Sequence, residues 1–326
     1  MQQIAIIATI KAIILTTFSL ILSAEIGQDK SIKCFFDSNL RNLGFLSYHT
    51  SILSQLKSQL NIRNLYTPIQ PTVKQMANAV SYNEILPDIQ LQPYIYCFWE
   101  LATNQPLNEQ FNYRVVADGC IDVFFDINNP DESFVMGFCK KYTEFELENV
   151  FHYIGIRFLP TMFPALFNIN AKDLSNHTQN LDAVVPSISK FISDNFSNEL
   201  DKSQRVHLLN TFFKNYINQH SFNYDNRVQN AINIILKNFG VLNIEKDLDV
   251  GLSSRQLRRL FEFYIGDSQK IFSQVVRFQN ILKAKPSIQS LKSNKLFLEQ
   301  GYYDQAHFIK NFKNFYGVTP NHAFRK

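Results

Sequence analysis

The C-terminal segment contains an amphipathic helix with a clear start and a clear stop. Asp304 is placed as the N-cap of this helix. The inward side chains recur at the i, i+4, i+7 spacing of one buried stripe: Phe308, Phe312 and Phe315. Gly317 and Pro320 are residues that end a helix. The segment therefore predicts a turn, a short capped helix and a stop.

The same pattern occurs upstream, where a second capped helix ends at Gly266. Ser253 or Ser254 is placed as its N-cap. The inward positions of this helix are Leu257, Leu260, Phe261 and Tyr264. Each of the two helices follows a shorter predicted helical piece, Ile244 to Val250 and Leu291 to Glu299. Two helix-turn-helix units are the economical interpretation.

Three arginines share the outward face of the upstream helix. Arg255, Arg258 and Arg259 lie at i, i+3, i+4, and no carboxylate of this helix precedes them at pairing distance. The planar guanidinium group of arginine can bond guanine through two nitrogen atoms and can also bind phosphate. This face therefore suits DNA, and a solvated basic surface is the alternative interpretation.

The outward positions of the helix after Asp304 are polar. They are Gln305, His307, Lys310 and Asn311. These side chains include donors and acceptors that read base edges and a cation that neutralises phosphate. An ordinary surface helix has a similar composition, so this helix alone does not separate the two interpretations.

The second unit also carries a longer motif: Gly301, Tyr302, Tyr303, Phe308, Phe312, Lys313, Gly317, Thr319 and Pro320. With this motif, residues from about 225 to 326 resemble the DNA-binding domain of the AraC/XylS family of bacterial transcription regulators. The resemblance implies that one long connecting helix, here Lys270 to Lys283, joins the two units. It also implies that two recognition helices enter successive major-groove segments about one helical turn, roughly 34 Å, apart.

The resemblance also implies which residues read bases. The family's base-reading positions fall on Arg255, Arg258 and Arg259 in the first helix, and on Gln305, Ala306 and Lys310 in the second. Ala306 offers only an apolar contact to a thymine methyl group. With the adjacent polar positions, the predicted DNA-binding residues are Ser254, Arg255, Arg258, Arg259, Gln305, Ala306, His307, Lys310 and Asn311.

Three features depart from the family pattern. Gln269 stands where the family usually has a proline, and Phe297 stands where a small alanine usually lets the recognition helix cross closely. The segment Ile244 to Val250 is one residue shorter than the corresponding supporting helix. Overpacking a small slot typically costs about 1 to 3 kcal/mol. These departures bear on DNA affinity more than on fold.

The distribution of charge agrees with a DNA-binding C-terminal region. From residue 221 onward there are sixteen Lys/Arg and eight Asp/Glu, a net charge of +8, whereas the rest of the chain carries −4. Positive charge is thus concentrated where the predicted DNA-binding helices lie. Counterion release from DNA would make such binding steeply dependent on salt.

The region between residues 82 and 184 consists of short apolar runs separated by turn residues. The predicted strands are Tyr94 to Glu100, Tyr113 to Val116, Ile121 to Ile127, Ser133 to Gly137 and His152 to Phe158. The predicted fold class is therefore α+β, with a mainly β N-terminal sensor domain before an all-α C-terminal domain that holds two helix-turn-helix units.

Helical spacing marks the connection between these two domains. Ser203 to Gln219 is one predicted helix, and Asp225 to Gly240 is the next, capped by Asp225 and stopped by Gly240. The predicted organisation is an extension over residues 1–80, a β-rich sensing domain over 81–185, a helical linker over 186–222 and a DNA-binding domain over 223–326.

Two motifs of the β-rich region resemble an uncharacterised N-terminal domain found in a subset of AraC-like regulators. They are Asp118-Gly119-Cys120 before the strand that starts at Ile121, and Gly155-x-Arg157-Phe158-x-Pro160.

The same region is acidic, because residues 82–150 hold twelve Asp/Glu against three Lys/Arg. An acidic, aromatic pocket that includes Trp99 would suit a cationic or polar small ligand, although acidic loops are usually only solvated. Arg157 is either a ligand anchor or a structural ion-pair partner.

The N-terminal segment Ile4 to Ala24 is apolar apart from Lys11 and scattered Ser/Thr, and it is long enough to span a bilayer. It lacks the basic start of a signal peptide, and Leu22 disrupts the small-residue cleavage pattern. Basic residues follow the segment, so insertion would keep the rest of the chain in the cytoplasm. We expect a cytoplasmic protein, with an inner-membrane anchor as the alternative.

Motifs for catalysis, metals and nucleotide cofactors are absent from the sequence. The four cysteines have no C-x-x-C spacing, the seven histidines form no metal-binding motif, and no phosphate-cradling glycine loop occurs. We expect no enzyme activity, no metal and no cofactor.

The expected function is DNA-binding transcription regulation, controlled by a small-molecule effector or a protein partner. Double-stranded DNA, RNA polymerase and a second copy of the chain are the expected partners. A sensory or protein-interaction module that keeps the helix-turn-helix fold is the alternative.

Overall fold

The structure is a computed structural model that describes residues 62–70, 79–220, 222, 224–284 and 301–324. All of these residues belong to the compact unit Gln55–Lys326. The apolar segment Ile4 to Ala24 and the predicted helical piece Leu291 to Glu299 lie outside the described residues. No helix within the described ranges is long and apolar enough to cross a membrane.

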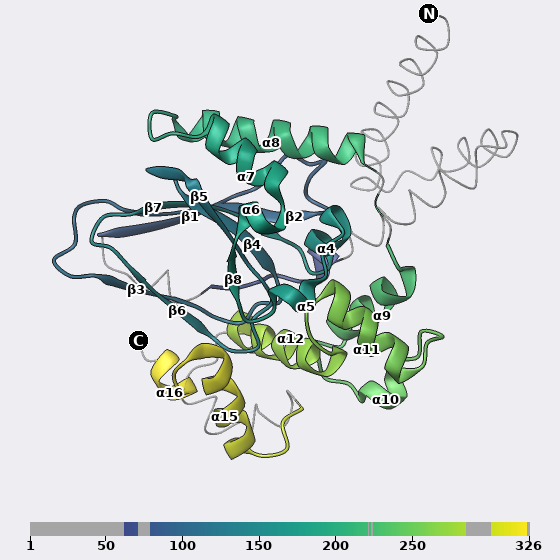
Figure 1. Ribbon diagram of the computed structural model, residues 1–326. Helices are drawn as coiled ribbons and strands as arrows, with labels where there is room; N and C mark the ends of the chain where they lie inside the picture. Colours follow the sequence, from purple (N-terminus) through teal and green to yellow (C-terminus); the bar gives the residue numbers. More distant parts are fainter. Residues whose placement is uncertain (1–61, 71–78, 221, 223, 285–300, 325–326) are drawn as a thin grey trace, which may run out of the picture. The chain divides into compact units, whose positions relative to one another are not determined.

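The described strands form two antiparallel sheets (Figure 1). The larger sheet has the order β1-β2-β7-β4-β5-β8, and β3 pairs with β6 in a two-stranded ribbon. The strands of the larger sheet are β1 (Val80–Ile85), β2 (Ile95–Thr103), β4 (Ile121–Asp126), β5 (Asn129–Met136), β7 (His152–Phe158) and β8 (Thr178–Asn180). The strands of the ribbon, named here the β3–β6 ribbon, are β3 (Phe111–Val115) and β6 (Thr143–Leu147).

All five predicted strands are present, and β7 has the predicted bounds. β5 starts at Asn129 instead of Ser133, because Asn129 already pairs with Asp126 across a tight hairpin. β1, β6 and β8 were not predicted. β1 and β6 contain glutamate residues between their apolar ones, and β8 has only three residues, so none of them shows a continuous apolar run.

Successive side chains of a strand point to opposite sides of a sheet. The two faces of the larger sheet therefore carry different side chains and pack against different parts of the chain. On β4, Val123 and Phe125 enter the main hydrophobic core, whereas Asp122 and Phe124 point to the other face. That other face is covered by the β3–β6 ribbon, whose Tyr113 joins a second apolar cluster. The face of Asp122 and Phe124 is named here the cavity face.

Helices cover the opposite, core face of the larger sheet (Figure 1). They are α4 (Met162–Phe167), α5 (Ala171–Leu174), α6 (Leu181–Val184), α7 (Pro186–Asn195) and α8 (Lys202–Gln219). Asp201 and Gln204 cap α8 reciprocally, and its Phe213 ring lies 5.8 Å from that of Phe158 on β7. The predicted helix Ser203 to Gln219 is thereby confirmed.

The described residues of the C-terminal region form helices joined by turns, and none of them form strands. Its helices are α9 (Asn226–Lys237), α10 (Ile244–Asp247), α11 (Ser254–Tyr264), α12 (Gln269–Ala284), α15 (Gln305–Tyr316) and α16 (Pro320–Ala323). α12 confirms the long connecting helix expected between the two units. α10 is shorter than predicted, because the Gly251 N–H bonds to the Asp249 side chain and Gly251 has a φ of 72° in the turn that follows.

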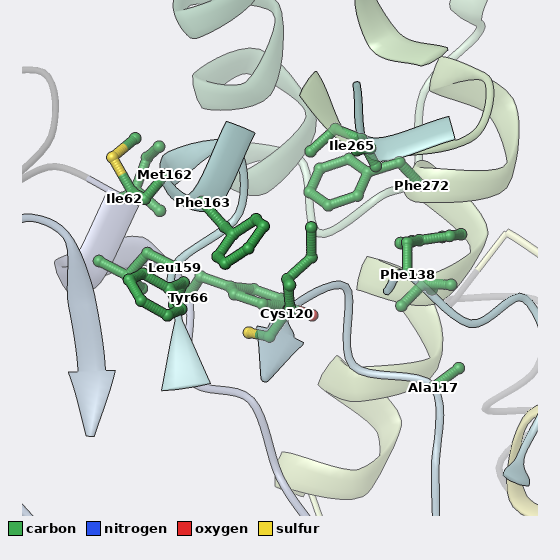
Figure 2. Close-up of a cluster of buried hydrophobic side chains, with 14 of the residues drawn as sticks. Ile62, Tyr66, Ala117, Cys120, Phe138, Leu159, Met162, Phe163, Ile265 and Phe272 are labelled. Atoms are coloured by element: carbon green, nitrogen blue, oxygen red, sulfur yellow. The ribbon is translucent and has the colours of Figure 1, made fainter. Parts of the chain in front are cut away.

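The helices after α8 share one hydrophobic core with the larger sheet. Figure 2 shows Phe272 of α12 and Ile265, which follows α11, in the same cluster as Cys120 and Phe138. The Gln279 side chain adds polar contacts, because its amide donates to the Ala117 carbonyl at 2.8 Å. α12 is therefore both the connector of the two helical units and a buried element of the core.

Candidate nucleic-acid interface and ligand cavity

α11 presents its arginines to solvent, as predicted. Ser253 caps the helix, and the Gln256 side chain bonds back to the Ser253 backbone in a capping box. Leu257 and Phe261 are buried, and this orientation directs the opposite side of the helix outward. The outward side chains are Ser254, Arg255, Arg258 and Arg259, all exposed.

The arginine cluster is less free than the sequence suggested. Glu262 follows Arg258 by one turn, and the Arg258 Nε atom lies 3.1 Å from the Glu262 carboxylate. Glu262 also binds Lys172 of α5 at 2.9 Å. The expectation that the three arginines have no carboxylate partner is therefore wrong for Arg258. Arg255 and Arg259 form no ion pair with the described residues.

α15 also has the predicted cap and orientation. The Asp304 side chain accepts the His307 N–H at 2.7 Å, and Gly317 ends the helix with a φ of 96°. The aromatic stripe is buried: Phe308, Phe312 and Phe315. The exposed positions are Gln305, Ala306, His307 and Lys310.

Asn311 differs from the other predicted contacts of α15 because it is only half exposed. Its side-chain oxygen accepts the hydroxyl of Tyr302 at 3.0 Å. The Asn311 side-chain oxygen thus holds Tyr302, which lies in the turn before α15. Asn311 is therefore less available for DNA than the fully exposed positions of α15. The spacing pattern did not reveal this contact, since Tyr302 lies outside the helix.

Arg277 of α12 is a positioning residue that the sequence did not reveal. Its guanidinium donates to the carbonyls of Gly240 and Gly301, both at 2.8 Å, and lies 5.2 Å from the ring centre of Tyr302. Gly240 and Gly301 adopt φ values of 71° and 72°, which favour glycine. One side chain thus joins the turn after α9 to the turn before α15. A lone arginine in a helix gives no local signal of such a role.

Two departures from the family pattern have different outcomes. Gln269 is the first residue of α12, where proline would also fit, and it is buried. Its side-chain oxygen has no hydrogen-bond partner among the described residues. Phe297 lies outside the described residues.

A cavity of about 250 Å³ lies between the larger sheet and the β3–β6 ribbon. Its lining is mostly aromatic and aliphatic: Trp99, Leu101, Tyr113, Val115, Asp122, Phe124, Phe134, Met136, Phe145, Glu146, Leu147, Tyr153 and Thr178. Phe124 is its central ring, with neighbouring ring centres 5.6 to 6.3 Å away. The predicted ligand contact Trp99 therefore lines a real cavity.

Gly155 makes room for the indole ring of Trp99. Gly155 pairs with Trp99 of β2 on one side and with Phe124 of β4 on the other. A Cβ atom added to Gly155 would lie 2.0 Å from the Trp99 ring. The absence of a side chain at this position is what allows two large rings to share the cavity face.

Arg157 lies behind the cavity wall, and only 1% of its side chain is exposed. Its guanidinium binds Asp122 at 2.9 Å and lies 3.5 Å from Asp118 and 3.6 Å from Glu84. Arg157 is not among the residues that line the cavity. Of the two roles that the sequence left open, the structure shows the ion-pair role.

Asp122 connects the buried ion pair to the cavity. It lines the cavity and also accepts the indole N–H of Trp99 at 3.1 Å. Burial raises the pKa of Asp122 to about 6, against the attraction of Arg157, which lowers it. The Asp118 side chain accepts the Cys120 N–H in the turn where Gly119 has a φ of 76°. Asp118 and Arg157, one residue from each N-terminal motif, thus lie 3.5 Å apart, and Arg157 also binds Asp122.

Comparison with known families agrees with this geometry. Residues 249–326 match a helix-turn-helix domain family, and residues 83–180 match a domain of unknown function, DUF6597. The C-terminal region is an AraC-type helix-turn-helix domain. Helices α11 and α15 both lie within the matched residues 249–326.

An uncharacterized HTH-type transcriptional regulator of Haemophilus influenzae is similar to this chain. The two are 28% identical over 191 residues, which cover 54% of this chain and 60% of the relative. The chain thus spans about 60% of the length of that curated relative.

Solved structures of ToxT from Vibrio cholerae are also similar. An apo variant has a TM-score of 0.35 at 11% identity, over 75% of this chain and 96% of that one. ToxT bound to an unsaturated fatty acid has a TM-score of 0.33 at 11% identity, over 75% of this chain and 94% of that one.

Proposed function

We propose that this chain is a sequence-specific DNA-binding transcription regulator whose helices α11 and α15 read successive major-groove segments. The observation that carries the proposal is a pair of capped helices in an AraC-type domain, each with exposed cations on its outer side. The protein acts on double-stranded DNA in the cytoplasm, with RNA polymerase and a second copy of the chain as partners. It performs no catalysis.

A small ligand in the cavity controls DNA binding in this proposal. The β3–β6 ribbon forms one wall of the cavity. Backbone next to the ribbon bonds to the end of α15: the Ala117 N–H donates to the Phe315 carbonyl at 3.3 Å, and the Tyr142 N–H donates to the Asn314 carbonyl at 3.2 Å. A ligand that shifts the ribbon would therefore change the support of the second recognition helix.

Gel shifts on the upstream region of the protein's own gene, at two salt concentrations, test the DNA-binding proposal. A protein with six to ten phosphate contacts loses about 10³ to 10⁵ in affinity between roughly 50 and 200 mM salt. We expect a specific shift that weakens over this range. The absence of any salt-sensitive shift would contradict DNA binding.

A protein-interaction module that retains the helix-turn-helix fold is the second candidate. One observation favours it: the Arg258 guanidinium is paired with Glu262. This ion pair would weaken DNA binding without altering the fold, because Glu262 competes with DNA for Arg258. An unshifted DNA fragment together with a normally folded protein would support this candidate.

Arg259→Ala is expected to weaken binding to a specific site by about 1 to 3 kcal/mol, because arginine bonds base edges and phosphates. Arg258→Ala should cost less, since Glu262 already binds that side chain. Titrated gel shifts measure both effects. Lys202→Ala, which removes an exposed cation from α8, is the matched control. Equal losses for Arg258→Ala and Arg259→Ala would contradict the ion-pair argument.

Lys310→Ala is expected to lower affinity for all DNA sequences alike, and to reduce the slope of log K against log salt by about 1. Lys310 stands at a position that the family resemblance assigns to base reading, but its exposed ammonium group can instead neutralise one phosphate, and this prediction assigns it that role. Binding measured over a salt series on specific and random DNA tests this. Lys190→Ala, on α7, is the control, and an unchanged slope for Lys310→Ala would rule out the phosphate contact.

A further inference from the structure

The charged groups near the cavity are mainly negative. The cavity lining contains two carboxylates, Asp122 and Glu146, and no Lys, Arg or His among the described residues. Behind the lining, the single guanidinium of Arg157 faces three carboxylates. With all groups ionised, Arg157 and these three carboxylates carry a net charge of −2, and the sum remains negative if one carboxyl is protonated. An incoming cation is therefore attracted, and an incoming anion is repelled.

Asp122 is positioned to meet such a cation. Its carboxylate is held by Arg157 on one side and by the Trp99 indole N–H on the other. This arrangement fixes the carboxylate at the end of the cavity where the Trp99 ring also lies. Preorganised polar groups in an otherwise apolar pocket usually determine which ligand binds.

The remaining lining suits the apolar part of the same ligand. Trp99 and Phe124 have ring centres 6.3 Å apart, and Phe124 and Tyr153 are equally close at 6.3 Å. Aromatic faces attract cations and also bury apolar groups. An apolar cavity of about 150 Å³ can hold a benzene molecule, so a cavity of about 250 Å³ can hold a ring with a short side chain.

We infer that the cavity binds a compact apolar amine, with its ring among Trp99, Phe124 and Tyr153 and its ammonium group beside Asp122. This inference rests on the proposed role of the cavity as the ligand site. It does not depend on DNA binding, which the gel shifts test separately. The ligand is thus defined by one positive charge and one apolar body of limited size.

Titration of the purified full-length chain with three matched probes tests this inference. The probes are 2-phenylethylamine, 2-phenylethanol and 3-phenylpropionate, which are a cation, a neutral analogue and an anion of similar size. Trp99 is the only tryptophan of the chain, so its fluorescence reports directly on the cavity. Calorimetry gives an independent affinity.

The amine is expected to bind at least about tenfold more tightly than the alcohol, a difference of about 1.4 kcal/mol, and the carboxylate is expected to bind worst. Asp122→Asn should reduce this preference by about tenfold or more, whereas Lys190→Ala should leave it unchanged. The wild-type comparison remains decisive even if Asp122→Asn fails to fold.

Equal binding of the amine and the alcohol, tighter binding of the carboxylate, or no binding of the amine would overturn the inference. Tighter binding of either other probe would leave the cavity as a ligand site and change only the ligand class. A failed gel shift, in contrast, would contradict DNA binding while leaving the amine result unaffected. Amine binding in the cavity and DNA binding are therefore tested by different measurements.

Discussion

Arg157→Met is expected to lower the free energy of unfolding by about 3 to 5 kcal/mol, the typical cost of breaking a buried ion pair by removing one partner. The reason is that Asp122, Asp118 and Glu84 would lose the one guanidinium that they share. Chemical denaturation followed by far-UV circular dichroism measures the change. Arg157→Lys is the matched control, because it keeps the charge and loses only the planar fork.

The loss in Arg157→Met should also depend on pH. Burial already raises the pKa of Asp122 in the folded protein to about 6, from an ordinary value of 3.8. A carboxyl whose folded pKa is raised favours folding while it is protonated, and this contribution is lost as pH rises through the folded pKa. Removing Arg157 raises that pKa further. Arg157→Met should therefore be less destabilised at pH 5 than at pH 8.

Two results would contradict this account of the ion pair. One is an equal loss of stability at pH 5 and pH 8 in Arg157→Met. The other is a failure of Asp122→Asn to restore part of the stability when it is added to Arg157→Met, since this second change removes one of the unpaired charges.

Phe312→Ala is expected to destabilise the chain by about 3 to 5 kcal/mol, the usual range for removing a buried phenyl ring. Phe312 is fully buried. It contacts Phe278 of α12 and stacks on Tyr316, with ring centres 5.4 and 5.3 Å away. Losing this ring leaves a cavity between α15 and the connecting helix.

DNA affinity should fall in Phe312→Ala even at temperatures where the chain stays folded, because α15 loses the contact that fixes its orientation. Thermal unfolding and gel shifts at low temperature separate the two effects. Phe312→Leu, which keeps most of the apolar volume, is the control and should lose much less. Normal DNA affinity in a folded Phe312→Ala protein would show that the ring does not orient the recognition helix.

The ends of the C-terminal helices could be predicted because their signals are local. Asp304 and Ser253 accept backbone N–H groups within one turn, and Gly317 adopts the left-handed conformation that ends α15. Such interactions depend on residues two to four positions away, so the sequence displays them directly. The Glu262 contact is less clear from the sequence, because this carboxylate also binds Lys172, which lies far away in the chain.

The cavity and its ion pair could not be predicted in the same way. Asp122 and Arg157 become neighbours only through the register between β4 and β7. Trp99 reaches the same place through the register between β2 and β7. Sequence spacing does not fix these pairings, so the sequence does not show that Asp118 and Arg157 of the two motifs lie 3.5 Å apart. Arg277 was missed for a similar reason, because the turns that it joins are far apart in the chain.

The close contact between Gly155 and Trp99 has a consequence for how this region can diverge. Any side chain at position 155 would overlap the indole ring, since a Cβ atom there would lie 2.0 Å from it. A descendant that acquires alanine or serine at 155 must therefore replace Trp99 with a smaller residue or move the ring. The two positions should covary among related proteins, and paired changes there would mark lineages whose ligand preference has shifted.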